Sequence, residues 1–345
     1  MPPKIVLVTG VSRFLGGHLA ARLAADDGIE RVLGVDTAPP PRELRPRMGR
    51  AEFIRADIRN PLIAKVIAGA GVDTVVHASL SPNPARSGGR VPMMEMNVIG
   101  TMQLLAACQQ ADSVTRLVIK STTAVYGASG RDPAMFTEDM GPKSLPSGGY
   151  AKDAVEIEGY VRGFSRRRPD VAVTMLRFTN FIGPRIETVM TRYFSLPVAP
   201  TVLGYDARVQ LLHEEDALAV LQRAVDAGPT GVFNVGGDGV LLLSQAIRRA
   251  GRVPLPVPGL VVGPVSRFFR GAGLVDFSAE QLRFLNFGRV VDTTRLRTEF
   301  GFTPRWTTAQ AFDAFVKGRG LRPLINPRRV AAAERELLGG LARLR

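Results

Sequence analysis

The feature that most constrains this chain is a strand, a glycine turn, a helix and a second strand within its first 36 residues. Residues 5–8 form a short apolar run typical of a buried strand, which breaks at Gly10. A helical pattern starts near Phe14, and a second strand over 31–35 ends on Asp36. Such a turn aims the unpaired N–H groups and the positive end of the helix at one point, which favours a phosphate. Because the terminal acid suits a ribose, the unit predicts a dinucleotide site.

Strands and helices continue to alternate after this unit. Further strands are expected over 51–57, 72–78 and 116–120, with a long helix over 96–109. This alternation specifies a parallel sheet covered by helices on both faces. The predicted fold is therefore α/β, a Rossmann-type doubly wound parallel sheet with a smaller C-terminal substrate-binding region. Ligands of such sheets lie beyond the carboxyl ends of the strands.

Composition limits the partners and the compartment that we expect. The chain has 45 Lys and Arg against 31 Asp and Glu, a net charge of +14. These cations are scattered without interleaved aromatic residues, so we expect no nucleic acid. The single Cys108 excludes an internal disulfide framework. No signal peptide and no apolar run of about 18 residues is found, so we expect a cytoplasmic protein.

Histidines give no sign of a metal site. His18 lies on the first helix and His77 ends the fourth strand. Neither has other ligands at metal-binding spacing, so no metal is predicted.

A set of motifs along the chain identifies a family resemblance. They are Thr9-Gly-x-x-x-x-x-Gly16, Asp36, Ala56-Asp57, Val75-Val-His-Ala78, Asn97-Val-x-Gly-Thr101, Ser121-Thr-x-x-Val-Tyr-Gly127, Leu176-Arg-x-x-Asn-x-Ile-Gly-Pro184, Leu212-His-Glu-Glu-Asp216, Phe233-Asn-Val-Gly-Gly237 and Asp292-Thr-Thr-x-x-x-x-Glu-Phe-Gly301. The chain resembles the extended short-chain dehydrogenase/reductase superfamily. Its NAD-dependent epimerase/dehydratase branch, which includes UDP-glucose 4-epimerases, is the best match. The likeness runs from about residue 4 to about residue 315.

The resemblance implies NAD as the cofactor. The cofactor-binding residues that it implies are Gly10, Ser12, Arg13, Phe14, Leu15, Gly16, Asp36, Asp57, Ile58, Ala78, Ser79, Asn97 and Tyr150. Arg13 stands where the extended family usually has glycine, and an arginine there suits the 2′-phosphate of NADP. Asp36 would repel that phosphate and accept a free ribose hydroxyl. We therefore expect NAD, with NADP as the alternative.

The resemblance also implies the catalytic pair, Thr122 and Tyr150. In the family's Tyr-x-x-x-Lys motif, the lysine lowers the tyrosine pKa from about 10 toward neutrality. This chain has Ala154 at that place. Lys152 lies two residues from the tyrosine and does not share its helix face. Lys120 is another candidate cation, but we favour its interpretation as a side chain that covers a strand end.

The substrate residues implied are Thr122, Asn180 and Arg208. Asn180 matches an asparagine that contacts the diphosphate of a nucleotide sugar, but it also suits a turn ahead of Gly183-Pro184. Arg208 is one position away from a family arginine that binds phosphate, and on an extended segment this shift points it to the opposite face. His213 and Asp216 are expected to position a helix start.

The expected domain organisation follows the same resemblance. Residues 1–180, with 211–240 returning to them, form the dinucleotide-binding domain, and 181–210 with 241–316 form the substrate-binding region. Residues 317–345 form a basic C-terminal helix or tail. The apolar, proline-rich stretch 254–270 and this tail admit contact with a membrane surface, which we do not favour. The family's habit of pairing the helices near 95–110 and 150–165 implies a homodimer.

Three functions remain open from the sequence. The first is an NAD-dependent nucleotide-sugar epimerase or dehydratase-type oxidoreductase, of low efficiency because of Ala154, and we favour it. The second is a catalytically impaired dinucleotide-binding protein that acts as a sensor or assembly partner. The third is a dehydrogenase of an apolar, sterol-like alcohol that binds at residues 254–270.

Overall fold

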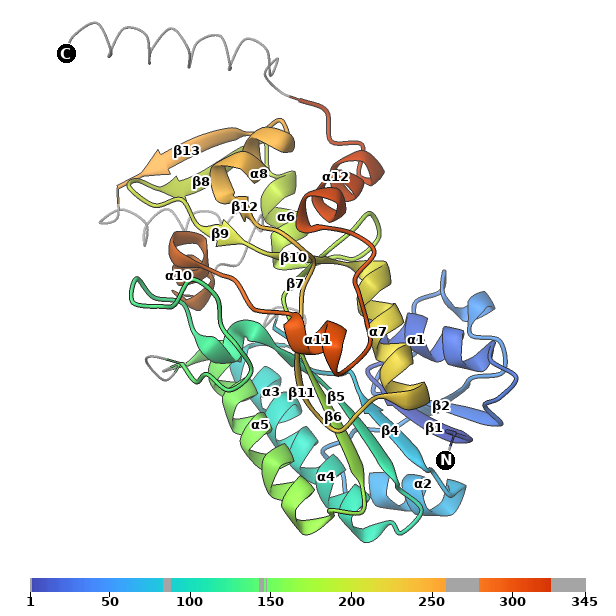
Figure 1. Ribbon diagram of the computed structural model, residues 1–345. Helices are drawn as coiled ribbons and strands as arrows, with labels where there is room; N and C mark the ends of the chain where they lie inside the picture. Colours follow the sequence, from blue (N-terminus) through green and yellow to red (C-terminus); the bar gives the residue numbers. More distant parts are fainter. Residues whose placement is uncertain (1, 83–87, 143–145, 147, 259–278, 324–345) are drawn as a thin grey trace, which may run out of the picture.

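A seven-stranded parallel sheet forms the centre of the molecule (Figure 1). The computed structural model describes residues 2–82, 88–142, 146, 148–258 and 279–323. In spatial order the strands are β11 (Gly231–Val235), β6 (Ala172–Phe178), β5 (Arg116–Thr122), β4 (Thr74–His77), β1 (Ile5–Thr9), β2 (Arg31–Asp36) and β3 (Glu52–Arg55). Each neighbouring pair is parallel, so all the carboxyl ends lie at one edge.

Helices cover both faces of this sheet because its strands carry apolar side chains on both. Val6 and Val8 of β1 pack in a core with the first face of helices, whereas Leu7 packs in a core on the other side. The first face holds α1 (Phe14–Ala24) and α7 (Glu214–Ala227), and the second holds α2 (Ile63–Ala70), α4 (Gly100–Gln110) and α5 (Gly149–Arg167). The predicted doubly wound parallel fold is confirmed.

The helix expected over 96–109 differs in one respect. The structure has α3 (Arg90–Met94), a π-helical turn η3 (Glu95–Ile99) and then α4. A π-turn inserts one extra residue into a helix and often marks a functional position. Here it turns the buried Asn97 toward the loop after β4.

The smaller region lies beyond the carboxyl edge of the sheet, in the upper part of Figure 1. Its strands pair as β10 (Leu211–His213) with β7 (Asn180–Ile182), β13 (Val253–Val257) with β8 (Val198–Val202), and β9 (Arg208–Val209) between β12 (Leu241–Leu242) and β14 (Gly288–Arg289). Its helices are α6 (Val189–Ser195), α8 (Leu243–Arg249), α10 (Ala279–Phe287) and α12 (Thr308–Gly318). A separate apolar core, which includes Tyr193, Phe194 and Phe312, holds them together.

Short elements complete the described chain. The 3-10 turns are η1 (Arg45–Arg47) and η4 (Thr123–Tyr126), and α11 (Thr294–Thr298) packs beside β11. Of the stretch 254–270, residues 259–270 lie outside the described residues, as does the tail from 324 onward. No helix in the described ranges has both the length and the apolar character needed to cross a membrane.

Candidate functional site

The glycine turn brings β1, α1 and the loop after β4 into close contact. Gly10 has a φ of 79°, in the left-handed region that favours glycine. A Cβ at Gly10 would lie 2.7 Å from the Cα of Ser79. The Gly10 N–H donates to the Val35 carbonyl at 2.9 Å, which ties the turn to β2. The turn therefore needs glycine here, and it places the start of α1 at the carboxyl edge of the sheet.

Asp36, at the end of β2, is fixed against this turn. Its Oδ2 accepts hydrogen bonds from the Ser12 backbone N–H at 3.0 Å and from the Ser12 Oγ at 2.6 Å. Its Oδ1 accepts from the Thr37 N–H at 2.8 Å. Since the carboxylate remains partly exposed, it can also accept hydrogen bonds from a ribose beside the turn.

Arg13 immediately precedes α1, and its backbone conformation does not require glycine. Its φ of −104° and ψ of 160° are extended values that any residue adopts. Its positive charge adds to the effect of burial, which lowers the pKa of Lys120, and partly opposes the effect of burial, which raises the pKa of Tyr150. The guanidinium field thus reaches from the glycine turn across β5 to α5.

The loop after β4 is clamped from two sides. The Ala78 N–H donates to the Thr9 Oγ1 at 3.1 Å. The Asn97 side chain accepts from the Ser81 N–H and donates to the Ser81 carbonyl, both at 3.0 Å. The π-turn therefore gives Asn97 a direct role in shaping the loop expected to hold the cofactor.

The remaining predicted cofactor residues lie around this edge with other partners. Asp57 accepts from the Arg59 guanidinium at 2.6 Å, and this hydrogen bond lowers the pKa of the Asp57 carboxyl. Ile58 is buried close to Gly100, and Leu15 is buried in the core beneath α1. The Phe14 ring lies 5.5 Å from the Arg185 guanidinium.

Thr122 and Tyr150 meet at the same edge. Thr122 ends β5, and its Oγ1 accepts from the Ala124 N–H at 3.1 Å. Tyr150 lies in the first turn of α5, and its hydroxyl approaches the Thr122 side chain, which favours the phenolate. The structure thus brings together the two hydroxyl groups predicted for catalysis.

The electrostatic surroundings of Tyr150 favour the neutral phenol. Burial and then the negative charge of Glu280 raise its pKa above the usual value near 10, and the opposing effects of Arg13 and Thr122 do not offset them. The carboxylate of Glu280 accepts from the Ala151 N–H at 3.1 Å. Ala154, one helical turn after Tyr150, is 1% exposed and packs against Val125 and Tyr126.

The family model that matches residues 6–236 is the NAD dependent epimerase/dehydratase family. The chain belongs to this family. An uncharacterized protein of Mycobacterium tuberculosis is 55% identical over 337 residues, covering 98% of this chain and 90% of that protein. The resemblance read from the motifs is therefore confirmed.

Solved structures show the same fold at lower identity. A UDP-glucose 4-epimerase from Thermotoga maritima with UDP-glucose has a TM-score of 0.70 and 18% identity, covering 91% of this chain and 98% of that chain. A dTDP-glucose 4,6-dehydratase from Bacillus anthracis in complex with NAD has a TM-score of 0.70 and 18% identity, covering 92% and 96%. The extended short-chain dehydrogenase/reductase fold thus spans nearly the whole chain.

Two residues that the family motifs imply for the substrate lie on the smaller region. Asn180 begins β7, is partly buried and makes no side-chain hydrogen bond within the described part of the chain. Arg208 is exposed on β9, whereas its neighbour Val209 is fully buried, so their side chains face opposite ways.

Sequence reasoning missed several charged groups of this site. Arg289, paired with Val209 in the small sheet, is buried and its Nε donates to the Gly127 carbonyl at 2.6 Å. Burial lowers its pKa to about 10. The Arg90 guanidinium binds Asp153 through two nitrogens at 2.6 and 2.9 Å and also reaches the Gly149 carbonyl. No motif contains these residues, because the fold joins them over 59 to 162 positions.

His213 and Asp216 have structural roles. The His213 Nδ1 accepts from the Glu215 N–H at the start of α7, at 3.2 Å. Asp216 accepts from the N–H groups of Arg305 and Trp306. No group of three or more His, Cys, Asp or Glu that could hold a metal ion exists among the described residues.

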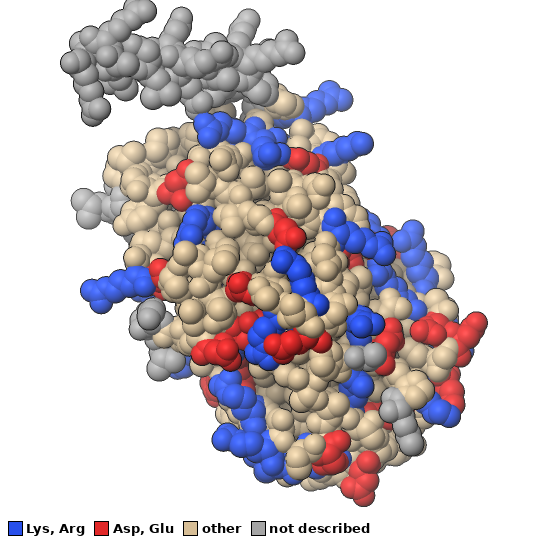
Figure 2. Space-filling view, in the orientation of Figure 1, with Lys and Arg blue, Asp and Glu red and all other residues tan. Residues whose placement is uncertain are grey.

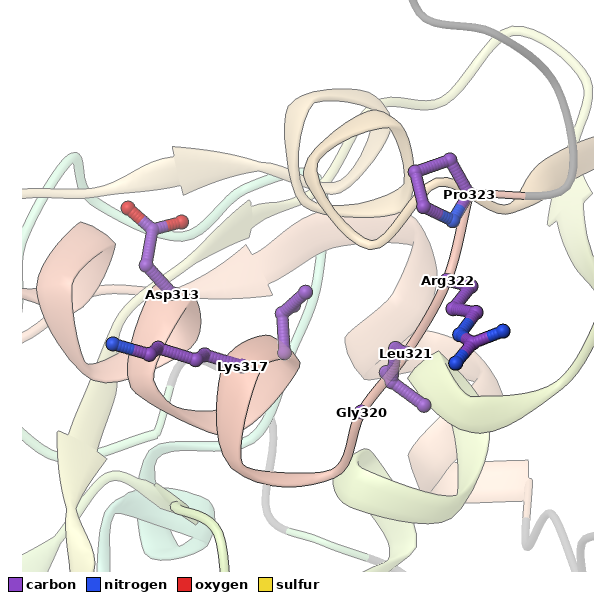
Figure 3. A pocket seen from close by; sticks show the side chains of 7 residues that line it. Asp313, Lys317, Gly320, Leu321, Arg322 and Pro323 are labelled. Atoms are coloured by element: carbon purple, nitrogen blue, oxygen red, sulfur yellow. The ribbon is translucent and has the colours of Figure 1, made fainter.

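A pocket of about 380 Å³ opens elsewhere, along the last turns of α12 (Figure 3). It is lined by Asp313, Val316, Lys317, Gly320, Leu321, Arg322 and Pro323. None of these is a predicted site residue, and Asp313 is paired with Arg249 at 2.9 Å. On the face shown in Figure 2, blue cations and red acids are interspersed.

Proposed function

We propose that this protein is an NAD-dependent oxidoreductase of the epimerase/dehydratase type that acts on a nucleotide sugar. The observation that carries the proposal is the approach of the Thr122 and Tyr150 hydroxyl groups, at the same sheet edge as the glycine turn and Asp36. Solved relatives of the fold contain NAD or UDP-glucose, which supports both ligands.

The residues at the turn fit a dinucleotide. A side chain at Gly10 would collide with Ser79, so glycine keeps the turn open for a ligand. The first N–H groups of α1 lie beside this turn and can donate to a phosphate. The Arg13 guanidinium suits a diphosphate, and the Asp36 carboxylate suits the two free hydroxyls of an adenosine ribose. A 2′-phosphate would face Asp36 at close range, so NAD is preferred over NADP.

NAD supplies the site with a group that accepts a hydride from a sugar carbon and can return it. The chain's own residues handle the proton. Thr122 and Tyr150 hold the oxygen of the reacting hydroxyl or carbonyl by hydrogen bonds. As a phenol, Tyr150 can donate its proton to a carbonyl oxygen that is being reduced, and its raised pKa makes it a weaker acid than free tyrosine in that step. To accept a proton from a hydroxyl, it first needs a cation that stabilises the phenolate.

Residues of the smaller region bind the rest of the substrate. Asn180 offers an amide that has no side-chain hydrogen-bond partner among the residues the structure describes, and the two cations Arg208 and Arg289 lie on adjacent strands. Arginine recognises diphosphates through paired N–H donors. The buried Arg289 is the better placed of the two, because it already lies beside Gly127.

A homodimer forms through the outer faces of α4 and α5. Ile99, just before α4, is 38% exposed and Met102, on α4, is 41% exposed. Apolar side chains that lie next to each other on a helix face favour association with a second copy.

The second candidate is a protein that binds the dinucleotide without efficient turnover. Ala154 favours it, because no cation follows Tyr150 on its face of α5. An assay of NAD-loaded protein with UDP-glucose distinguishes the two candidates. Chromatography of the reaction mixture measures conversion to the 4-epimer or to a 4-keto product. Turnover supports the enzyme. Binding of NAD and of UDP-glucose without turnover over days supports the second candidate, and NAD binding without UDP-hexose binding overturns the nucleotide-sugar assignment.

A further inference from the structure

The inference concerns the cation that α5 lacks, and it rests on the proposed function. Ala154 is enclosed by apolar side chains. Lys152 is exposed and lies two residues from Tyr150, so it faces away. Asp153 is buried and bound to Arg90. Helix α5 therefore offers no positive charge to the nicotinamide side of a bound dinucleotide.

Strand β5 offers one instead. Side chains alternate along a strand, so Val118, Lys120 and Thr122 point to the same face. Val118 packs in the core beneath α1 and α7, and the Thr122 side chain acts on the Tyr150 hydroxyl. Lys120 therefore lies between the core and the two catalytic hydroxyls, on the side of the sheet where the glycine turn begins.

The amine of Lys120 reaches toward the carboxyl edge. Its Nζ donates to the Leu80 carbonyl at 2.7 Å, and the residue is only 7% exposed. Leu80 lies three residues beyond His77, the last residue of β4, which pairs with Ile119. Because the Leu80 loop is clamped by Thr9 and Asn97, the amine is held at the place expected for the cofactor.

This amine has hydrogen-bonding capacity that the protein does not use. An ammonium carries three N–H donors, and Leu80 is the one hydrogen-bond partner of Lys120 among the described residues. Buried donors without partners are costly, so they mark a place for a ligand with acceptor groups. Ribose hydroxyls are such acceptors.

We propose that Lys120 is the cofactor-facing cation of this site, supplied by strand β5 in place of the helix position occupied by Ala154. It holds the nicotinamide ribose at the sheet edge where Thr122 and Tyr150 meet. The sequence alone favoured a side chain that merely covers a strand end; the buried amine at the Leu80 carbonyl supports the other alternative.

Charged and titratable neighbours make the proposal measurable. Burial and then the positive charge of Arg13 lower the pKa of Lys120 to about 7. The charge of Lys120 also acts on His77 of β4. Burial and then this charge lower the pKa of that imidazole to about 3, so His77 stays neutral near pH 7. The diphosphate of NAD would offset Arg13 and raise the pKa of Lys120. Lys120 should therefore take up a proton when NAD binds.

Calorimetric titration of NAD at pH 7.5, in two buffers of different ionisation enthalpy, measures this uptake. We expect the wild type to take up a fraction of a proton per site, and Lys120→Met to take up none. Lys120→Met should also bind NAD about ten- to a hundredfold more weakly, as for loss of a charged hydrogen bond. Lys152→Met is the matched control and should behave as the wild type.

A double variant tests the substitution directly. Adding Ala154→Lys to Lys120→Met should restore NAD affinity and turnover to at least a tenth of the wild-type values. If Lys120 has a purely structural role, the second substitution restores neither. If Lys120→Met fails to fold, NMR of the wild type with ¹³C-methylated lysines serves, because the chain has only six. The Lys120 resonance should then titrate at a higher pH with NAD than without it.

The outcomes are distinguishable. Wild-type protein that fails to bind NAD overturns both the proposed function and the role of Lys120. NAD binding that is equal in wild type and Lys120→Met, without proton uptake in either, overturns the role of Lys120 alone. An unchanged Lys120 titration on NAD binding does the same.

Discussion

Replacing Arg177 with methionine removes one partner of a buried ion pair that supports the edge of the candidate site. The side chains of Arg177 and Glu158 are 8% and 3% exposed. Two guanidinium nitrogens donate to the Glu158 carboxylate at 2.7 and 2.9 Å, and a third donates to the Tyr126 hydroxyl and the Glu138 carbonyl. Glu158 also accepts from the Ser121 Oγ at 2.7 Å, next to Thr122.

The expected loss follows from this enclosure. Removing one partner of a buried pair leaves an uncompensated charge and costs about 3–5 kcal/mol. The Tyr126 hydroxyl and the Glu138 carbonyl each lose a hydrogen bond as well. Domains of ordinary stability unfold with about 5–15 kcal/mol, so Arg177→Met should fold only marginally. Replacing both partners, as in Arg177→Met with Glu158→Met, should recover most of the loss because no charge remains buried.

Urea unfolding followed by circular dichroism measures these differences. Arg162 provides the matched control, since it contacts the same Glu158 carboxylate at 3.4 Å but is 53% exposed. Arg162→Met should lower the free energy of unfolding by less than about 0.5 kcal/mol. If Arg177→Met loses less than about 1 kcal/mol, or no more than Arg162→Met, the reasoning about this buried network is wrong.

Four further predictions concern the site. Tyr150→Phe should lower turnover of UDP-glucose by about 10²- to 10⁴-fold while NAD affinity, measured by calorimetry, changes little; undiminished activity would remove Tyr150 from the mechanism. Asp36→Asn should weaken NAD about tenfold and narrow its advantage over NADP, and an unchanged preference would show that Asp36 does not discriminate. Met102→Glu should shift a dimer toward monomer in light scattering. The control Leu62→Glu, at an exposed residue just before α2, should leave the dimer intact, and a monomeric wild type would contradict the proposed dimer. Because the folded pKa of Lys120 lies near 7 and the unfolded one near 10.4, the stability contributed by this group rises with pH from 7 to 10. Lys120→Met should therefore be more stable than wild type at pH 6, by a margin that shrinks toward pH 10 in urea unfolding, and a pH-independent margin would contradict the lowered pKa.

The sheet and the glycine turn at its carboxyl edge were predictable because their signals are local. Apolar runs set the strands, glycine at position 10 sets the turn, and Asp36 ends the next strand. Each of these depends on a few consecutive residues, and the parallel order follows from the alternation with helices. The place of Thr122 beside Tyr150 was predictable through the family motifs.

The charged surroundings of the site were not predictable in this way. Glu280 reaches Ala151 over 129 positions, and Arg289 reaches Gly127 over 162. No periodicity or spacing reports such contacts. The π-turn at Asn97 was also missed, because one inserted residue barely alters a helical pattern. The burial of Lys120 was missed for the same reason. A lysine at the end of a strand is expected to be exposed, and here residues distant in the sequence bury it.

The most direct test of the dinucleotide site is a calorimetric titration of the purified protein with NAD and, separately, with NADP. The glycine turn with Asp36 predicts one NAD per chain and weaker binding of NADP, because a 2′-phosphate on a ribose bound at this turn would lie against the Asp36 carboxylate. Absence of NAD binding, or tighter binding of NADP than of NAD, would contradict the assignment.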